Sequence, residues 1–190
     1  MKIYALLLLL FTTLILQGCV SAVVIGTAAF ATKTATDPRT LGKQVDDNIL
    51  EIRIKNMLSK NQKLKNTRIS NITYQGKVLL IGQAPTLKLI KYAKQIVMSV
   101  NDVTEVYNEI RQSQPISLKH TFIDTWITTK IRFHFLISDI VKSSNIKIST
   151  ENGEVFLLGI VTDVEGKTAA ALSSKVNGVK HVITAFTYLQ

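Results

Sequence analysis

Apolar and polar residues repeat along the chain with a fixed offset of 77 positions. The segment YQGKVLLIG at residues 74–82 corresponds to ENGEVFLLG at residues 151–159. After a deletion of one residue, VNDVTEVYNEI at 100–110 also aligns with VNGVKHVITAF at 176–186. Self-similarity at a fixed offset indicates repeated copies of one structural unit. The pattern therefore predicts two similar domains, at residues 45–113 and 114–190.

Within each copy the pattern predicts the order helix, strand, strand, helix, strand. Asp47 and Asp124 precede the helical patterns and are candidate N-caps, because an Asp oxygen can accept from free amides of a first helical turn. A Gly follows Gln75 and Asn152 between β-branched runs, which predicts a tight hairpin in each copy. The second strands are expected to end at Gly82 and Gly159.

The last three elements of each copy are a strand, a helix and a strand. Such a connection implies that the two strands are parallel and that the crossover is right-handed. The predicted fold class is therefore α+β, with a three-stranded mixed sheet covered by two helices in each domain.

The start of the chain has the pattern of an export signal. Positive Lys2 precedes an apolar run from Ile3 to Leu16, which is too short for a transmembrane helix and has the length of a signal-peptide core. The run ends in LQGC, which resembles the lipobox of bacterial lipoproteins. That resemblance implies removal of residues 1–18 and attachment of lipid, including palmitate, to Cys19.

Residues 19–44 would then form a lipidated tether. Cys19 is the only cysteine, so an internal disulfide is excluded. In a Gram-negative cell, the sorting rule for such lipoproteins implies the outer membrane, because Val20 is not Asp. The alternative is an uncleaved anchor that crosses the membrane between Ile3 and Ala31.

The first helix of the second copy carries two apolar faces. At 100° per residue, one face contains Ile127, Ile131 and Phe135, which match core positions of the first copy. The other face contains large apolar residues where the first copy is mostly polar, namely Trp126, Phe133, Leu136, Ile137 and Ile140. Lys130 and Arg132 flank this second face, and a Trp-bearing apolar face rimmed by cations is typical of a helix at a membrane interface.

Two alternatives for the second face remain open. It could pack against the first copy or the tether, or it could fill a groove on a protein partner.

Charge and reactive residues narrow the possible functions. The formal net charge of +10 suits anionic lipid or nucleic acid, although a solvated lysine-rich surface would have the same composition. There is no basic platform interleaved with aromatic residues, and export argues against nucleic acid. The histidines are scattered without metal-ligand spacing and the serines have no paired base, so we expect a non-enzyme without metal or cofactor, apart from the lipid on Cys19.

Both copies resemble BON domains, through the Gly-x-Val-x-Leu-x-Gly hairpin and the Val-x-x-Val-x-x-Val approach to the last strand. With the lipobox and tether, the chain resembles dual-BON-domain outer-membrane lipoproteins. The resemblance implies exposure to the periplasm, binding of phosphatidylglycerol or cardiolipin through the second domain, support of outer-membrane integrity, and enrichment at division sites. The expected phospholipid-binding residues are Trp126, Ile127, Lys130, Arg132, Phe133, Leu136, Ile137 and Ile140.

The resemblance also implies proximity to the outer-membrane protein assembly machinery. An adaptor for that machinery, with lipid contact secondary, is therefore the alternative function. The candidate surface for it is the solvated face of the first copy that carries Lys55, Lys60, Lys63 and Lys65.

Overall fold

The computed structural model describes residues 40–189. The predicted signal peptide, Cys19 and most of the predicted tether lie outside the described residues. Within residues 40–189, no helix is both long and apolar enough to cross a membrane.

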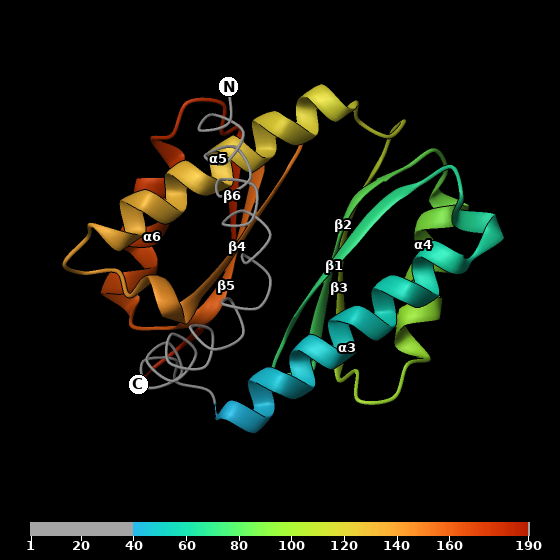
Figure 1. Ribbon diagram of the computed structural model, residues 1–190, viewed down its shortest axis with the longest axis horizontal. Helices are drawn as coiled ribbons and strands as arrows, with labels where there is room; N and C mark the ends of the chain where they lie inside the picture. Colours follow the sequence, from blue (N-terminus) through green and yellow to red (C-terminus); the bar gives the residue numbers. More distant parts are fainter. Residues whose placement is uncertain (1–39, 190) are drawn as a thin grey trace, which may run out of the picture. The chain divides into compact units, whose positions relative to one another are not determined.

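The described chain contains two copies of the same series of elements (Figure 1). Domain 1 consists of α3 (Leu41–Lys60), η1 (Gln62–Leu64), β1 (Arg68–Tyr74), β2 (Lys77–Ala84), α4 (Leu87–Met98) and β3 (Glu105–Gln112). Domain 2 consists of α5 (Leu118–Leu136), η2 (Ser143–Asn145), β4 (Ile146–Glu151), β5 (Glu154–Val161), α6 (Asp163–Ser174) and β6 (His181–Tyr188). The predicted order of helices and strands is confirmed in both copies.

Each domain contains a three-stranded mixed sheet, as predicted. The central strand, β2 or β5, is antiparallel to the strand before it and parallel to the strand after the second helix. Side chains alternate across the central strand, so Val78 and Leu80 pack with α3 and α4, whereas Leu79 and Ile81 point to the opposite face. Both faces of each sheet are therefore buried, one under its own helices.

The prediction that Asp47 and Asp124 are N-caps is wrong. The helices begin earlier, after Thr40 and Ser117, and both carboxylates lie buried in the second turn of a helix. Each accepts two hydrogen bonds, of 2.8 to 2.9 Å, from the backbone amides of its own domain's hairpin turn. The turn residues have positive φ, as Asn-Gly-type hairpin turns require. An Asp on the first helix thus fixes the hairpin in each domain.

Gly82 and Gly159 do not end the second strands but lie inside them, opposite Ile69 and Ile146. The backbone of the neighbouring strand passes so close that a β-carbon at either position would collide with a carbonyl oxygen. Gly82 also has a φ of +126°. Glycine is therefore required here by the close approach of two strands.

The second face of each sheet packs against the other domain. The apolar part of this interface contains Ile72, Tyr74, Leu79 and Ile81 from domain 1 and Phe156, Leu158 and Ile160 from domain 2. The helices of each domain lie on the face of its sheet that is turned away from the other domain. The layers follow the order helices, sheet, sheet, helices.

Polar contacts at this interface are related by the repeat. Tyr74 and Glu151 occupy equivalent positions, as do Gln83 and Ile160. The Tyr74 hydroxyl accepts from the amide of Ile160 at 3.1 Å, and the buried Glu151 carboxylate accepts from the Gln83 side-chain amide at 3.0 Å. Arg68 donates to the same carboxylate at 2.9 Å.

A second cation joins the domains at the edge of the interface. Arg111 of β3 forms an ion pair with Glu154 of β5 at 3.0 Å. The hydrogen bond to Glu154 raises the pKa of Arg111. Partial burial acts in the opposite direction, but its effect on this pKa is smaller.

Candidate functional site

Helix α5 begins at Leu118, six residues before the predicted start at Asp124. The Ser117 side chain makes no capping bond to the helix amides and instead lies 2.9 Å from Nδ1 of His120. At 1.5 Å per residue, the 19 residues of α5 extend about 28 Å. The added turns change the candidate site, because they bring further apolar side chains onto its outer face.

The inner face of α5 forms part of the core of domain 2. Ile127, Ile131 and Phe135 are fully buried and pack with residues of β4, β5 and α6. Ile127 was included among the expected phospholipid-binding residues. Because its side chain has no exposed surface, it does not belong to an outer site, and its role is to hold α5 on the sheet.

The outer face of α5 is an exposed apolar ridge. Trp126 is 61% exposed, Leu136 is 68% exposed, and Phe122, which was not predicted, is 75% exposed. We call this surface the α5 ridge and define it as Leu118, Phe122, Trp126, Phe133, Leu136, Ile137 and Ile140. Ile137 caps the helix and Ile140 lies in the loop after it, so the ridge continues past the end of α5.

Leu118 and Phe122 were missed because the helix was expected to start at Asp124. Both lie on the ridge by helical spacing, at eight and four residues before Trp126. Extending the same period backward along the sequence would have found them.

Cations lie beside the ridge. The Lys130 ammonium lies 5.2 Å from the centre of the Trp126 ring, within the range of a cation–π contact. Arg132 and Lys142 are exposed. Among the ion pairs of the described residues, none involves Lys130 or Arg132. Their charges are therefore available to an external anion.

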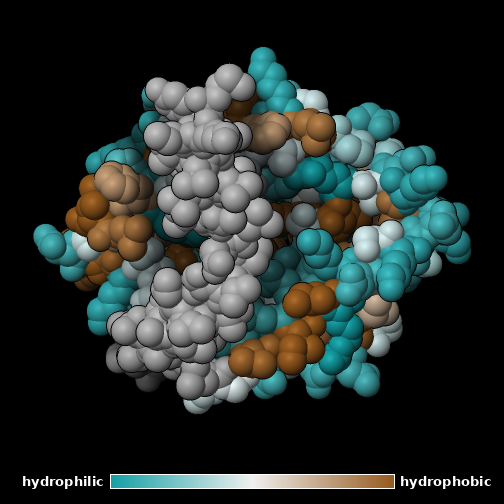
Figure 2. Space-filling model, in the orientation of Figure 1, coloured by the Kyte–Doolittle hydropathy of each residue, from teal (hydrophilic) through white to brown (hydrophobic). Residues whose placement is uncertain are grey.

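The ridge does not pack against domain 1, since the two sheets form the contact between the domains. Figure 2 shows apolar surface at both ends of α5. It also shows an apolar area over the first half of α3, where Val45, Ile49 and Ile52 are exposed. The outer face of α3 is therefore more apolar near its start than the sequence comparison had suggested.

Comparison with known proteins shows the family of this chain. Residues 46–114 and 123–190 each match the model of the BON domain. The chain belongs to the BON-domain family. The earlier resemblance, drawn from the hairpin and valine motifs, is thus confirmed.

Three relatives are similar over most of their length. The outer membrane lipoprotein DolP of Haemophilus influenzae is 44% identical over 183 residues, which cover 96% of this chain and 94% of that protein. The 21 kDa hemolysin of Actinobacillus pleuropneumoniae is 45% identical, over 81% of this chain and 80% of that protein. Osmotically-inducible protein Y of Escherichia coli is 29% identical, over 79% and 76%.

These relationships identify the BON-domain chain as an outer-membrane lipoprotein of the DolP type. None of the three relatives carries the name of an enzyme. Among the described residues, there is no group of three or more His, Cys, Asp or Glu that could hold a metal ion.

Proposed function

We propose that this lipoprotein binds anionic phospholipid through the α5 ridge, on the periplasmic side of the outer membrane, and thereby supports membrane integrity. The observation that carries the proposal is the exposed apolar ridge, with Trp126 and Phe133 at its centre and unpaired cations beside it. A soluble domain gains nothing by leaving so many large apolar side chains in water, and such patches mark interaction surfaces.

The apolar contribution is large enough to matter. An aromatic side chain can bury about 150–250 Å². At about 25 cal/mol per Å², transfer of half that area from water to the acyl boundary contributes about 2–3 kcal/mol. Phe122, Trp126 and Phe133 lie along one face of α5, so a membrane can receive all three together.

The cations add selectivity for anionic headgroups. A Lys or Arg near an anionic membrane contributes about 1 kcal/mol, and salt screens the attraction within about 8–10 Å. Lys130 stacks on Trp126, so insertion of the ring brings the ammonium to the level of the lipid phosphates. Arg132 supplies a second charge close to the ridge.

Acylation of Cys19, which is part of this proposal, would keep domain 2 near its ligand. Several acyl chains hold a protein permanently at a membrane, whereas one chain gives only marginal binding. For a tethered protein, even a weak surface contact is largely occupied because the effective concentration is high.

The test uses residues 19–190 with Cys19→Ser, so that no acyl chain contributes. The chain is expected to bind phosphatidylglycerol vesicles and to leave phosphatidylcholine vesicles largely unbound in a flotation assay. Trp126→Glu and Leu136→Glu should each lower the affinity for phosphatidylglycerol at least tenfold, with unchanged circular dichroism.

The matched control is Ile49→Glu, because Ile49 occupies the position of Trp126 in domain 1 and is similarly exposed. It should leave vesicle binding within about twofold of the parent chain, since an isolated surface change has little effect on other sites. Equal binding to both lipids, or unchanged binding by both α5 variants, would reject the proposal.

A further inference from the structure

The basic residues of domain 1 are separated from its acidic residues along the sequence. Residues 52–101 contain no Asp or Glu but include ten Lys and Arg residues. Three of these cations are in ion pairs with carboxylates outside the stretch, namely Arg53, Arg68 and Lys77. The other seven are absent from the ion pairs of the described chain: Lys55, Lys60, Lys63, Lys65, Lys88, Lys91 and Lys94.

These seven lysines lie on one layer of the protein. They belong to α3, α4 and the segment that contains η1. That layer covers the face of the sheet turned away from domain 2. Figure 2 shows hydrophilic surface over α4 and the end of α3. The layer therefore carries seven cations that form no ion pair with a carboxylate among the described residues.

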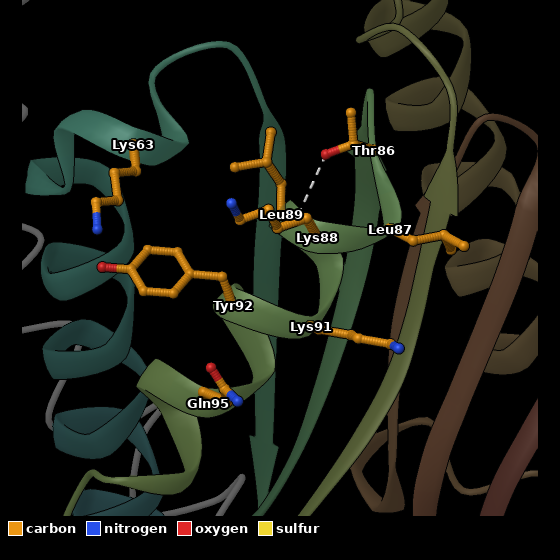
Figure 3. A pocket seen from close by; sticks show the side chains of 8 residues that line it. All are labelled: Lys63, Thr86, Leu87, Lys88, Leu89, Lys91, Tyr92 and Gln95. Atoms are coloured by element: carbon orange, nitrogen blue, oxygen red, sulfur yellow. Dashed lines mark hydrogen bonds between the residues drawn. The ribbon is translucent and has the colours of Figure 1, made fainter.

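A groove of about 840 Å³ is present in this layer, between η1 and α4 (Figure 3). Tyr92 and Leu89 give it an apolar wall, and Thr86 caps the start of α4 at one end. Figure 3 shows Lys63 and Lys88 on the side of α4 that carries Tyr92, whereas Lys91 extends to the opposite side.

Local contacts hold the groove in shape. The Lys63 ammonium lies 5.1 Å from the centre of the Tyr92 ring. The Asn61 side-chain amide donates to the Tyr92 hydroxyl at 3.3 Å, while its oxygen accepts from the amide of Lys63 at 3.0 Å. Asn61 thus links the two walls of the groove.

We propose that this groove is a docking site for an acidic segment of a protein partner that also carries apolar side chains. Charge complementarity supports an acidic occupant, because the groove is lined by Lys63, Lys88 and Lys91 and by no carboxylate. Side chains such as leucine would pack on Tyr92 and Leu89, while carboxylates would pair with Lys63 and Lys88. Rim charges of this kind mainly determine partner choice and the rate of association.

A protein occupant fits this layer better than a second lipid contact. The groove layer and the α5 ridge lie on opposite outer layers, so a bilayer bound by the ridge leaves the groove accessible to the periplasm. This step depends on the proposed function, whereas the charge and shape of the groove do not. The groove also lacks an exposed Trp or Phe that could enter an acyl region.

The test measures, by fluorescence anisotropy, the binding of a labelled 12-residue peptide with three Glu-Glu-Leu-Ser repeats, called the Glu peptide. A neutral peptide with three Gln-Gln-Leu-Ser repeats is measured for comparison. Residues 19–190 with Cys19→Ser should bind the Glu peptide at least tenfold more tightly. The double variant Lys63→Gln/Lys88→Gln should lose at least about fivefold in affinity, since each exposed ion pair contributes up to about 1 kcal/mol.

The matched control is Lys55→Gln/Lys60→Gln, which removes the same charge from the same layer outside the groove. Its affinity should change less than about twofold. Equal losses in the two double variants would show diffuse attraction and overturn the proposal, as would equal binding of the two peptides.

Vesicle binding separates this proposal from the lipid proposal. In a Trp126→Glu chain, which tests only the α5 ridge, binding of the Glu peptide should be unchanged. If Lys63→Gln/Lys88→Gln instead lowers binding to phosphatidylglycerol vesicles and leaves the Glu peptide bound, the groove is a lipid contact and the docking proposal is wrong.

Discussion

The two domains share a frame and differ on the outer face of their first helix. In both, three apolar residues one turn apart bury the helix on the sheet, and an Asp fixes the hairpin. Near the start of α3, Val45 and Ile49 are exposed and match Phe122 and Trp126 of α5. In the second half, Asn56, Ser59 and Lys60 of α3 are replaced in α5 by Phe133, Leu136 and Ile137.

The difference shows how one fold can present two chemically different outer surfaces. Exposed positions on a helix can change without loss of packing, because the buried stripe alone attaches it to the sheet. Domain 2 carries a ridge where domain 1 has a short apolar area, while domain 1 carries unpaired lysines on its helix layer. The two domains therefore differ most on their outer layers, whereas their inner layers follow the repeat.

The largest expected effect tests the shared frame. Asp47→Ala and Asp124→Ala should each lower the free energy of unfolding by about 3 kcal/mol, because two hairpin amides lose a charged acceptor and one of them is buried. Urea unfolding followed by circular dichroism measures the change. Asp46→Ala, at an exposed neighbouring position, should change stability by less than about 0.5 kcal/mol. Comparable losses at Asp46 and Asp47 would contradict the anchoring role.

A smaller loss of stability is expected at the interface between the domains. There, equivalent positions of the repeat hold a charged acceptor, Glu151, and a neutral acceptor, Tyr74. Glu151→Ala leaves the buried Gln83 amide and Arg68 without their acceptor, and should cost about 2 kcal/mol. Tyr74→Phe, at the equivalent position, removes a neutral acceptor and should cost about 1 kcal/mol.

Urea unfolding of the two variants side by side checks this order. A larger loss for Tyr74→Phe than for Glu151→Ala would show that the neutral contact determines the stability of the interface.

The repeat itself made much of this fold predictable. A matching period in two segments gave the element order, the mixed sheet and the outer apolar face of α5. The helix starts were predicted wrongly because Asp is a favoured N-cap residue, and Asp47 and Asp124 were therefore placed at the helix ends. The amides that these carboxylates accept from instead lie 28 and 29 residues further along the chain. That contact exists only after the hairpin has packed on the helix.

The packing of sheet on sheet was also not predicted, although a signal was present. The run from Val78 to Ile81 is apolar at every position, and such runs are typical of strands buried on both faces. The partner for the second face could not be read from one strand. It depends on residues of both repeats that meet only in the assembled pair of domains.

Exchange of residues between the copies sharpens the comparison directly. Phe133→Asn, Leu136→Ser and Ile137→Lys together give α5 the outer residues of α3. The triple variant should bind phosphatidylglycerol vesicles at least about tenfold more weakly, because an aromatic and two aliphatic side chains no longer enter the acyl boundary. Its unfolding midpoint should be close to that of the parent, since all three positions are exposed.

The reverse exchange in α3 is the matched control, with Asn56→Phe, Ser59→Leu and Lys60→Ile. If the apolar pattern alone is sufficient, this chain gains a second ridge and binds vesicles more tightly. Unchanged binding by the α5 variant would show that the difference between the two outer faces has no role in lipid contact.

The smallest effect is expected from the cations beside the ridge. Lys130→Gln and Arg132→Gln should each weaken binding to phosphatidylglycerol about fivefold at low salt, since each charge contributes about 1 kcal/mol near an anionic surface. The loss should shrink as salt rises from about 0.05 to 0.5 M. The shorter Debye length weakens the attraction of these cations to the membrane in the parent chain, so their removal then matters less. Lys55→Gln, a cation on α3 without a neighbouring ridge, should have no effect at either salt concentration. If Lys130→Gln weakened vesicle binding equally at all salt concentrations, Lys130 would act by packing on Trp126. The charge of Lys130 would then not explain why one domain binds the membrane and the other does not.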